Sequence, residues 1–287
     1  MALSHYRTIA LSNYVTILFH LSDLHFGPKF NAHLSELILQ DVENAKPDLT
    51  ILSGDFTMRA RIEEFEQARA YIEKLPKPIF TIPGNHDQPL VPNLGVMWER
   101  ATTPWARYKK YIHATEDTSL ALADLFVVGV NSNNRIVPGG IWSGSQRKFI
   151  AQEFSRAPIG VCKIFVTHHH IEWNGKYRPF GTWFPTAQLN WLAKLGVELI
   201  LNGHTHVPLN LQTTQGIVIA QAGTSMSGRV RHGHGNAYNR IKLERDSLTV
   251  QIMGYDEHAD KFIQRSEKTF PRRASPVAIS SLQEKTA

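Results

Sequence analysis

The sequence predicts an α/β protein in which strands and helices alternate along the chain. Short apolar runs recur between Val15 and Leu201, and several are separated by segments with apolar residues at helical spacing. After His206 the pattern changes to short alternating segments without a helical period. These two observations imply parallel strands joined by helices, followed by a more antiparallel region that closes the fold.

The apolar runs of the first part are typical of buried strands because they are short and continuous. Helices are expected where apolar residues fall on one face of a 3.6-residue period. The predicted strands cover residues 15–21, 49–53, 79–82, 126–130, 163–167, 198–201, 217–220, 239–243 and 249–253, and the predicted helices cover 34–45, 62–75, 146–157 and 186–194.

Length and composition fit a single globular domain. The chain has 287 residues, of which 42% are hydrophobic and 20% charged, so it can bury a large core. We expect one domain over residues 1–265. From residue 266 the sequence shows no hydrophobic period, so residues 266–287 are expected to form a flexible C-terminal tail.

Composition also restricts compartment and partners. Cys162 is the only cysteine, which excludes an internal disulfide and favours a reducing compartment. The apolar run from Tyr14 to Leu21 is too short for a bilayer and lacks a cleavage pattern, so we expect a cytoplasmic protein without a membrane partner. The net charge of +6 favours anionic substrates. No dense basic run interleaved with aromatics occurs, so no stable nucleic-acid partner is expected. The sequence is compatible with a homodimer.

Five loops that directly follow predicted strands carry Asp, His or Asn. In parallel α/β sheets such loops gather in one crevice. Carboxylate, amide and imidazole ligands suit Mn, Fe or Zn. One block alone fits an ordinary turn or helix cap, but seven candidate side chains exceed the shell of one ion. Two ions sharing a carboxylate accommodate them, and that arrangement suits phosphate-ester hydrolysis. The blocks are Ser22-Asp23-Leu24-His25, Gly54-Asp55-Phe56, Gly84-Asn85-His86-Asp87, His168-His169-His170 and Gly203-His204-Thr205-His206.

The order of these blocks across residues 15–210 resembles the calcineurin-like metallophosphoesterases, whose pattern is Asp-x-His, Gly-Asp, Gly-Asn-His with a trailing Asp, His, and Gly-His-x-His. The resemblance implies a four-layer α/β/β/α sandwich around two metal ions, with Asp55 bridging them. It implies a first metal held by Asp23, His25, Asp55 and His206, and a second held by Asp55, Asn85, His168 and His204.

The same resemblance implies an activity. His86 would contact the phosphate and protonate the leaving group, and Asp87 would orient its imidazole. Within the family the pattern is most similar to bacterial class III cyclic nucleotide phosphodiesterases. We therefore expect a phosphodiesterase acting on a cyclic nucleotide or a glycerophosphodiester by attack of a metal-bridging hydroxide. A phosphomonoesterase, a nuclease and a non-catalytic scaffold are the alternatives.

The sequence departs from the cyclic nucleotide phosphodiesterases at one place that bears on substrate specificity. The cyclic nucleotide enzymes usually have prolines after the histidine block, whereas here His170 is followed by Ile171-Glu172-Trp173. Residues 173–178 would then form a distinctive rim around the substrate.

Several further residues allow two interpretations. His168 is the expected ligand of its block, with His169 as the alternative, and His20 is expected to be a hydrogen-bonded core residue. The aromatic stretch from Trp98 to Tyr111 is expected to be the packed face of a helix, with a lid over the site as the alternative. Candidates for substrate binding are Asn85, His170, Arg229 and Arg231, the last two lying in a Gly-rich segment with His232 and His234 that otherwise reads as a surface loop.

Overall fold

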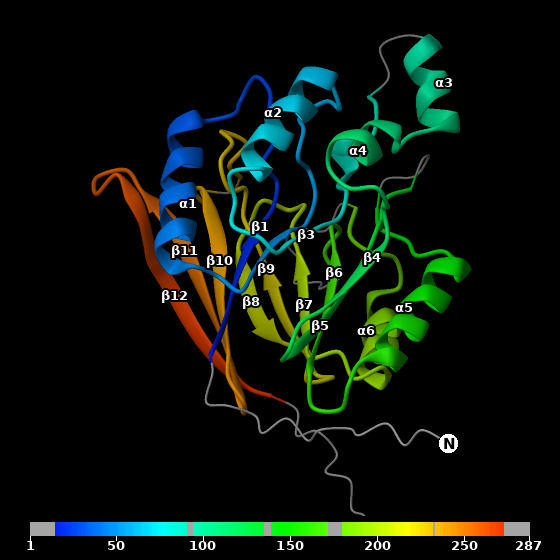
Figure 1. The fold of residues 1–287 in the computed structure, drawn as a ribbon, viewed down its shortest axis with the longest axis vertical. Coiled ribbons are helices and arrows are strands. Elements are labelled where there is room, and N and C mark those ends of the chain that lie inside the picture. Colours follow the sequence, from blue (N-terminus) through cyan, green and yellow to red (C-terminus); the bar gives the residue numbers. More distant parts are fainter. Residues whose placement is uncertain (1–14, 91–93, 135–138, 172–179, 232, 273–287) are drawn as a thin grey trace, which may run out of the picture.

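The protein folds as two six-stranded sheets that face each other, with helices on their outer faces (Figure 1). The structure is a computed structural model that describes residues 15–90, 94–134, 139–171, 180–231 and 233–272. Residues from both sheets form one apolar core, and each outer face packs on its own helices. The predicted four-layer α/β/β/α sandwich is therefore confirmed.

The first sheet combines parallel strands from the start of the chain with antiparallel strands from its end. Its parallel strands are joined by two helices, whose apolar faces pack on the outer side of the sheet. In order across the sheet, the strands are β12 (Lys261–Pro271), β11 (Ser247–Asp256), β10 (Ala237–Leu243), β1 (Thr16–Leu21), β2 (Leu49–Leu52) and β3 (Ile79–Thr81), and the helices are α1 (Ala32–Ala45) and α2 (Ile62–Ile72).

The second sheet has four central parallel strands and one antiparallel strand at each edge. Two helices cover its outer face, where Ile150 and Phe154 pack with Leu192. The strands in order are β4 (Thr118–Ala121), β5 (Leu125–Val130), β6 (Cys162–Thr167), β7 (Leu199–Asn202), β9 (Val218–Gln221) and β8 (Leu209–Gln212), and the helices are α5 (Gly144–Arg156) and α6 (Pro185–Lys194).

The predicted strands and helices match observed elements, and the parallel strands lie in both sheets of the predicted sandwich. Parallel strands divide between two sheets because each strand is apolar on both faces and needs two covers. In this fold one face meets helices and the other meets the opposite sheet. Leu18 and Ile51 of the first sheet thus share a core with Val127, Ile164 and Leu201 of the second, all fully buried.

Helices α3 (Leu94–Thr102) and α4 (Ala106–Tyr111) lie between β3 and β4 in the chain. Trp105 and Tyr108 are buried, and the Tyr108 hydroxyl lies 3.0 Å from Thr81 Oγ1, so the packed-face interpretation holds for them. Trp98 is 72% exposed on α3, which projects from the body (Figure 1). None of the helices in the described residues has the length and apolar content needed to cross a bilayer.

The expected flexible tail over residues 266–287 is wrong in its first part. Strand β12 continues to Pro271 and pairs with β11, with Ser266 opposite Ile252 and Phe270 opposite Leu248. Because β12 is an edge strand, most of its side chains face solvent and are polar, which hides the period of a strand. The boundary expected at residue 265 therefore falls inside β12, and residues 273–287 lie outside the described part.

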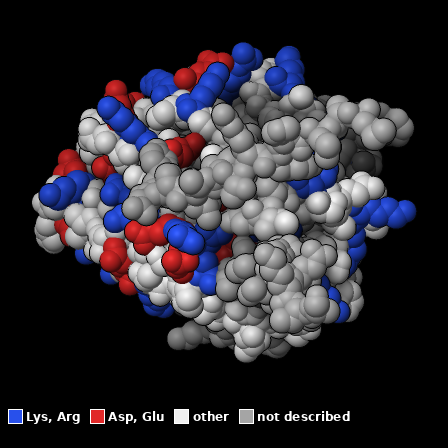
Figure 2. Space-filling view, turned by 60° about the horizontal axis from the view of Figure 1, so that its bottom comes forward, with Lys and Arg blue, Asp and Glu red and all other residues white. Residues whose placement is uncertain are grey.

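Surface charges are mixed on the face drawn in Figure 2, where Lys and Arg side chains alternate with Asp and Glu among the coloured residues. No broad patch of one sign forms among the residues drawn there.

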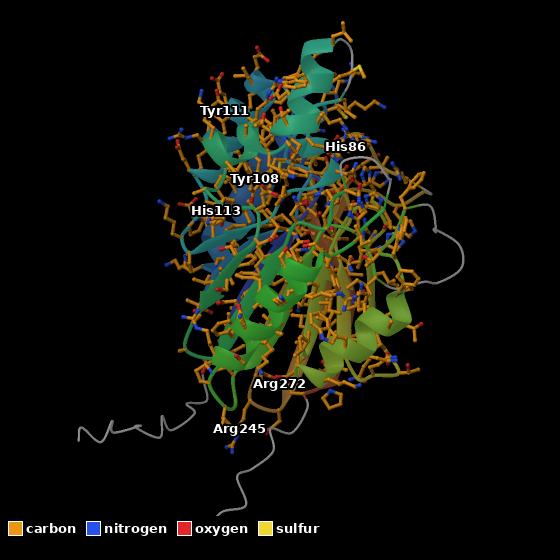
Figure 3. All side chains as sticks on the ribbon, turned by 90° about the vertical axis from the view of Figure 1, so that its right-hand side faces the viewer. His86, Tyr108, Tyr111, His113, Arg245 and Arg272 are labelled. Carbon is orange, nitrogen blue, oxygen red and sulfur yellow. The ribbon has the colours of Figure 1, made fainter. Side chains whose placement is uncertain are left out.

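Arg272 follows β12 and joins the two sheets. Its Nη2 and Nε donate to the carboxylate of Glu198, which precedes β7, at 3.0 and 3.1 Å. Burial disfavours charge on Arg272, but the Glu198 carboxylate raises its pKa above the ordinary value. Both side chains are about nine-tenths buried, with exposures of 9% and 10%. Figure 3 shows Arg272 at the end of the molecule opposite His86.

We predict that Arg272→Met lowers the free energy of unfolding by about 3 kcal/mol, because it leaves the Glu198 carboxylate buried without a partner. Urea unfolding followed by circular dichroism measures the change. Arg245→Met removes an exposed arginine at the same end (Figure 3) and should change stability by less than about 0.5 kcal/mol. Equal effects of the two substitutions would contradict the anchoring of β12.

Candidate metal centre

The five ligand-bearing loops meet between the two sheets. The loops after β1, β2 and β3 belong to the first sheet, and those after β6 and β7 belong to the second. Hydrogen bonds join these loops directly. The His204 amide donates to Asp23 Oδ2 at 3.0 Å, and the Gly203 amide donates to the His168 carbonyl at 3.1 Å. The predicted gathering of these loops is therefore observed, with ligands drawn from both sheets.

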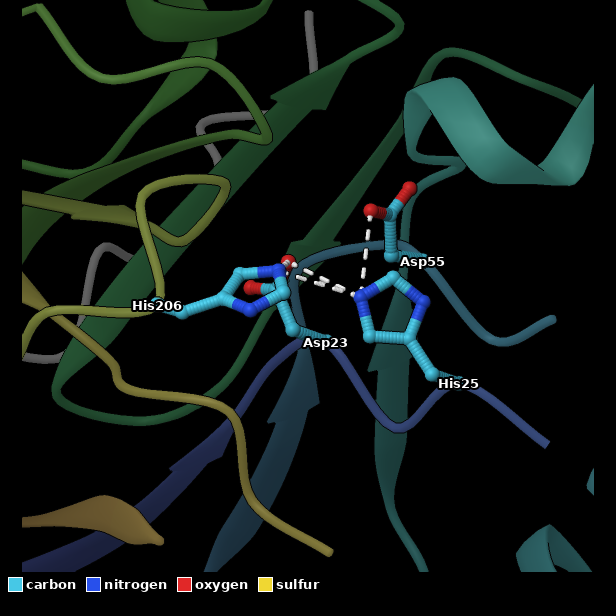
Figure 4. A group of neighbouring side chains, drawn as sticks. All are labelled: Asp23, His25, Asp55 and His206. Atoms are coloured by element: carbon cyan, nitrogen blue, oxygen red, sulfur yellow. Dashed lines mark hydrogen bonds and ion pairs between the residues drawn. The ribbon is translucent and has the colours of Figure 1, made fainter. Parts of the chain in front are cut away.

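The first group consists of Asp23, His25, Asp55 and His206 (Figure 4). All four are buried, and their ligand atoms lie within 4.8 Å of one another. His206 Nε2 lies 3.1 Å from both Asp23 Oδ1 and His25 Nε2. His25 Nε2 lies 3.6 Å from a carboxylate oxygen of Asp23 and of Asp55. This is the set that the family resemblance implies for the first metal.

Hydrogen bonds fix where the protons of the two imidazoles lie. His25 Nδ1 faces the Thr57 carbonyl at 3.2 Å, and His206 Nδ1 faces the Arg229 carbonyl at 2.6 Å. A carbonyl only accepts, so each Nδ1 must carry the proton and donate it. Burial lowers the pKa of His25 to about 4, although the neighbouring Asp23 and Asp55 carboxylates act to raise it. This ring is therefore neutral at neutral pH.

The remaining atoms form a set of lone pairs without protons. The Nε2 atom of a neutral ring protonated at Nδ1 is an acceptor, and Asp23 Oδ1 is buried without a hydrogen-bond partner in the described structure. Converging acceptors in a buried place need a cation, and the first group therefore fits a divalent metal ion.

The second group contains Asn85, His168 and His204. His168 Nε2 and His204 Nδ1 lie 3.0 and 2.9 Å from the same oxygen, Asn85 Oδ1. His168 Nδ1 donates to the Ser53 carbonyl at 2.8 Å, which turns Nε2 toward the group. Burial opposes charge on His168, yet Asp55 and Asp23 raise its pKa to about 9. The carboxylates therefore create a field that favours positive charge here as well.

Asp55 lies between the two groups. Its Oδ2 is 3.6 Å from His25 Nε2, and its Oδ1 is 3.4 Å from His168 Nε2. Oδ1 also accepts from the His86 amide at 2.8 Å. Burial would raise the pKa of Asp55, but His168 and His86 hold it far below its usual range. One carboxylate oxygen thus faces each group, which is the geometry a bridging ligand requires.

The backbone of the ligand loops is strained. Five ligand residues adopt left-handed backbone conformations, which cost non-glycine residues on the order of 1 kcal/mol each or more. Such conformations persist only where the surrounding contacts hold them, and they cluster at functional sites. The residues and their φ angles are Asp23 (53°), His25 (50°), Asp55 (57°), His204 (71°) and His206 (62°).

Two glycines permit the close approach of these loops. A β-carbon on Gly203 would collide with the side chains of Ser22 and Asp23, and one on Gly84 would collide with the backbone and carboxylate of Asp55. Neither glycine has a left-handed φ, so the requirement here is space rather than conformation. The glycines of the two motifs therefore set the distance between the ligand loops.

His86 lies beside the first group, but Asp87 does not orient it as expected. His86 Nδ1 donates to the Met58 carbonyl at 2.7 Å. Asp87 instead accepts from the amides of Thr57 and Gly84 at 2.9 and 2.8 Å, so it locks the loops after β2 and β3 together. Burial and the nearby Asp55 raise the pKa of Asp87 to about 7. The orienting group was missed because a backbone carbonyl carries no sequence signal.

The substrate-binding candidates separate clearly. The guanidinium of Arg229 reaches the site, with Nη1 2.9 Å from His86 Nε2 and 3.4 Å from His25 Nε2. Arg231 is exposed, and within the described part of the chain no hydrogen bond or ion pair joins it to the ligand groups. His170 is buried, and its ring stacks on that of His204 at 5.9 Å.

Other uncertain histidines are placed as follows. His169 Nδ1 lies 2.8 Å from Ser132 Oγ, whereas His168 faces the ligand group. His20 is fully buried between Ser53 Oγ and Asn239 Nδ2, so its interpretation as a core histidine is confirmed. Residues 173–178 and His232 lie outside the described part of the chain.

A cavity of about 290 Å³ opens beside the second group. Its wall combines apolar surface with amide and imidazole groups, and the lining residues that the structure describes include no carboxylate. Most of them could not be predicted from the sequence, because they lie outside the five blocks. They are Asn85, Gln88, Leu90, Arg100, Asn133, Asn134, Gly139, His169, Phe180 and His204.

We predict that Gly203→Ala lowers the free energy of unfolding by about 2 kcal/mol and reduces metal content, because the new methyl group pushes the loop of His204 and His206 away from Asp23. Elemental analysis after Mn loading and thermal unfolding measure both effects. Gly144→Ala is the control, since a β-carbon there meets open space at the start of α5. Full metal content in Gly203→Ala would contradict the close packing of the loops.

Comparisons with known proteins agree with this geometry. The family model for calcineurin-like phosphoesterases matches residues 17–208. Glycerophosphodiester phosphodiesterase GpdQ of Enterobacter lignolyticus (strain SCF1) is 34% identical over 99 residues, which are 28% of this chain. The chain spans about a third of the length of this curated relative, 35%.

Solved structures share the fold at low sequence identity. Purple acid phosphatase PPD1 from yellow lupin (Lupinus luteus) seeds has a TM-score of 0.66 at 14% identity, over 91% of this chain and 54% of that one. A dimetal phosphatase from Danio rerio has 0.64 at 11% identity, over 90% and 99%. GAP50, the anchor in the inner membrane complex of Plasmodium, has 0.64 at 12%, over 91% and 90%.

The family match runs from β1 to β7 and covers all five ligand-bearing loops, and four of the side chains that the family pattern predicts lie together in the first group. This agreement supports a hydrolase that acts on phosphate esters. The chain belongs to the calcineurin-like phosphoesterase family.

Proposed function

We propose that this protein is a phosphodiesterase that hydrolyses a small phosphodiester with two metal ions. The observation that carries the proposal is the position of Asp55, whose two oxygens face two separate groups of buried ligands. Preference for a diester rests on the similarity to glycerophosphodiester phosphodiesterase GpdQ over 99 residues.

The metal ions would be held by the two groups already described, with Asp55 shared. When bound, they would supply positive charge that polarises the phosphate and acidifies a water molecule. Imidazole, amide and carboxylate ligands accept Mn, Fe or Zn, and availability decides among them.

The chain itself positions the substrate and the protons. Hydrolysis forms a P–O bond to water and breaks the P–O bond to the leaving alkoxide, which takes up a proton. His86 Nδ1 donates to the Met58 carbonyl, so its Nε2 faces the edge of the first group, where it can take up the proton that the attacking water loses and pass it to the leaving alkoxide. The cavity next to Asn85 and His204 has room for one substituent of the phosphate.

We predict that Asp55→Asn abolishes turnover and removes most of the bound metal, because an amide supplies one neutral oxygen where two negative oxygens face two ions. Metal analysis and hydrolysis of bis-p-nitrophenyl phosphate measure the two losses. Asp246→Asn changes an exposed carboxylate elsewhere and should retain both properties. An Asp55→Asn protein with full metal content and full turnover would refute the bridging role.

We predict that His86→Ala retains its metal ions and lowers kcat roughly 100-fold, the usual contribution of a positioned proton donor. Steady-state kinetics with parallel metal analysis separates this from ligand loss. A collapse of metal content would instead place His86 among the ligands.

The alternative activities are a phosphomonoesterase and a nuclease, and the third alternative is a scaffold. GAP50 shares the fold and is described as an anchor, so the fold alone does not establish catalysis. A panel of bis-p-nitrophenyl phosphate, p-nitrophenyl phosphate, cyclic AMP and single-stranded DNA, each with Mn, separates them. Fastest hydrolysis of p-nitrophenyl phosphate or DNA would replace the diesterase proposal, and no hydrolysis with any divalent metal would favour the scaffold.

A further inference from the structure

We propose that Arg229 binds a phosphoryl oxygen of the substrate, forming with His86 an anion site at the edge of the first ligand group. The proposal rests on the proposed function only in that the anion is taken to be a phosphate. It concerns a residue outside the five ligand blocks.

The position of the guanidinium points to this role. Arg229 Nη1 lies 2.9 Å from His86 Nε2, 3.4 Å from His25 Nε2 and 3.6 Å from Met58 Sδ. The charge of Arg229 therefore sits between a ligand of the first group and the histidine expected to face the phosphate. A planar guanidinium with several donors matches the geometry of phosphate oxygens.

Among the residues that the structure describes, no carboxylate forms an ion pair with Arg229. The hydrogen bonds of its guanidinium there come from Nη1, and their partners are imidazole nitrogens and a thioether sulfur. A half-buried cation of this kind gains most from an anionic ligand, to which Nε and Nη2 can still donate.

The loop holds Arg229 in place before any ligand binds. The Gly228 amide and the Ser227 hydroxyl both donate to the Lys29 carbonyl, at 2.8 and 3.2 Å. Asn236 Nδ2 donates to the Ser227 carbonyl at 2.9 Å, which closes the loop. The Arg229 carbonyl accepts from His206 Nδ1, so the same residue also orients a metal ligand.

The hydrogen bond from Arg229 to His86 has a consequence for substrate binding. Because His86 Nδ1 donates to the Met58 carbonyl, His86 Nε2 accepts from Arg229 when the ring is neutral. A phosphoryl oxygen is a stronger acceptor for a guanidinium than an imidazole nitrogen. Phosphate would therefore draw the Nη1 donor away from His86 and leave Nε2 able to accept the proton that the attacking water loses and to pass it to the leaving alkoxide.

A different role for Arg229 is that of a counter-charge to Asp23 and Asp55. In that case metal ions and Arg229 would compete, because like charges repel. The two roles predict different results. Removal of the guanidinium weakens phosphate binding if Arg229 forms an anion site. If Arg229 is a counter-charge, its removal strengthens metal binding and leaves phosphate binding unchanged.

The test compares Arg229→Met and Arg229→Lys with the wild type, all loaded with Mn. Titration calorimetry with inorganic phosphate gives the dissociation constant, and elemental analysis gives the metal content. We expect Arg229→Met to raise the dissociation constant roughly 10-fold to 100-fold, the loss of a hydrogen bond between charged groups. Arg229→Lys should recover part of this, since it keeps the charge without the fork of donors.

Arg245→Met is the matched control, because it removes the same charge from an exposed position at the far end of the molecule (Figure 3) and should leave the dissociation constant unchanged. Unchanged phosphate affinity in Arg229→Met overturns the proposal, whether or not metal affinity rises. If Arg229→Met loses its metal, the test uses Arg229→Lys loaded with Mn. A dissociation constant for phosphate above that of the wild type supports the proposal, and an unchanged one overturns it. Arg229-dependent phosphate binding by a wild-type protein that hydrolyses no ester would leave the anion site standing and refute only the proposed function.

Discussion

The architecture depends on one electrostatic constraint: negative oxygens and imidazole lone pairs converge in a buried place without protons between them. Asp23, Asp55 and the Nε2 atoms of His25 and His206 are all removed from water. Such a set is unfavourable unless positive charge joins it. The raised pKa of His168 shows the same demand, since a proton is the positive charge that this ring can recruit.

The rest of the site follows from supporting that convergence. Ligands on short loops must approach more closely than ordinary side chains allow, which explains the glycines at 84 and 203 and the left-handed backbone of five ligand residues. Backbone carbonyls of Ser53, Thr57 and Arg229 hold the outer nitrogens of three imidazoles. The strain is therefore balanced by hydrogen bonds that fix the rings.

Sequence reasoning reached the ligands but not the groups that orient them. Asp23, Asp55 and His206 could be predicted because they belong to spaced blocks at strand ends, a pattern that side-chain identity reveals. The Met58 carbonyl could not, since any residue supplies a carbonyl, and Asp87 was consequently given the wrong partner.

The fold was predicted to a similar depth. The buried parallel strands are continuous apolar runs, and their sequences predict them well. The edge strand β12 is polar on most positions and pairs through its backbone, so its sequence looks like a tail. How the parallel strands divide between two sheets depends on long-range packing, which no local period encodes.

A metal ion bound by ligands from both sheets would link the two sheets to each other. Three ligand loops extend from the first sheet and two from the second, while the Arg272–Glu198 pair joins the sheets at the other end. The two sheets would then be joined at both ends, by an exchangeable ion at one and by the Arg272–Glu198 pair at the other. A bound ion would stabilise the folded sandwich in proportion to the logarithm of the free metal concentration once this exceeds the dissociation constant.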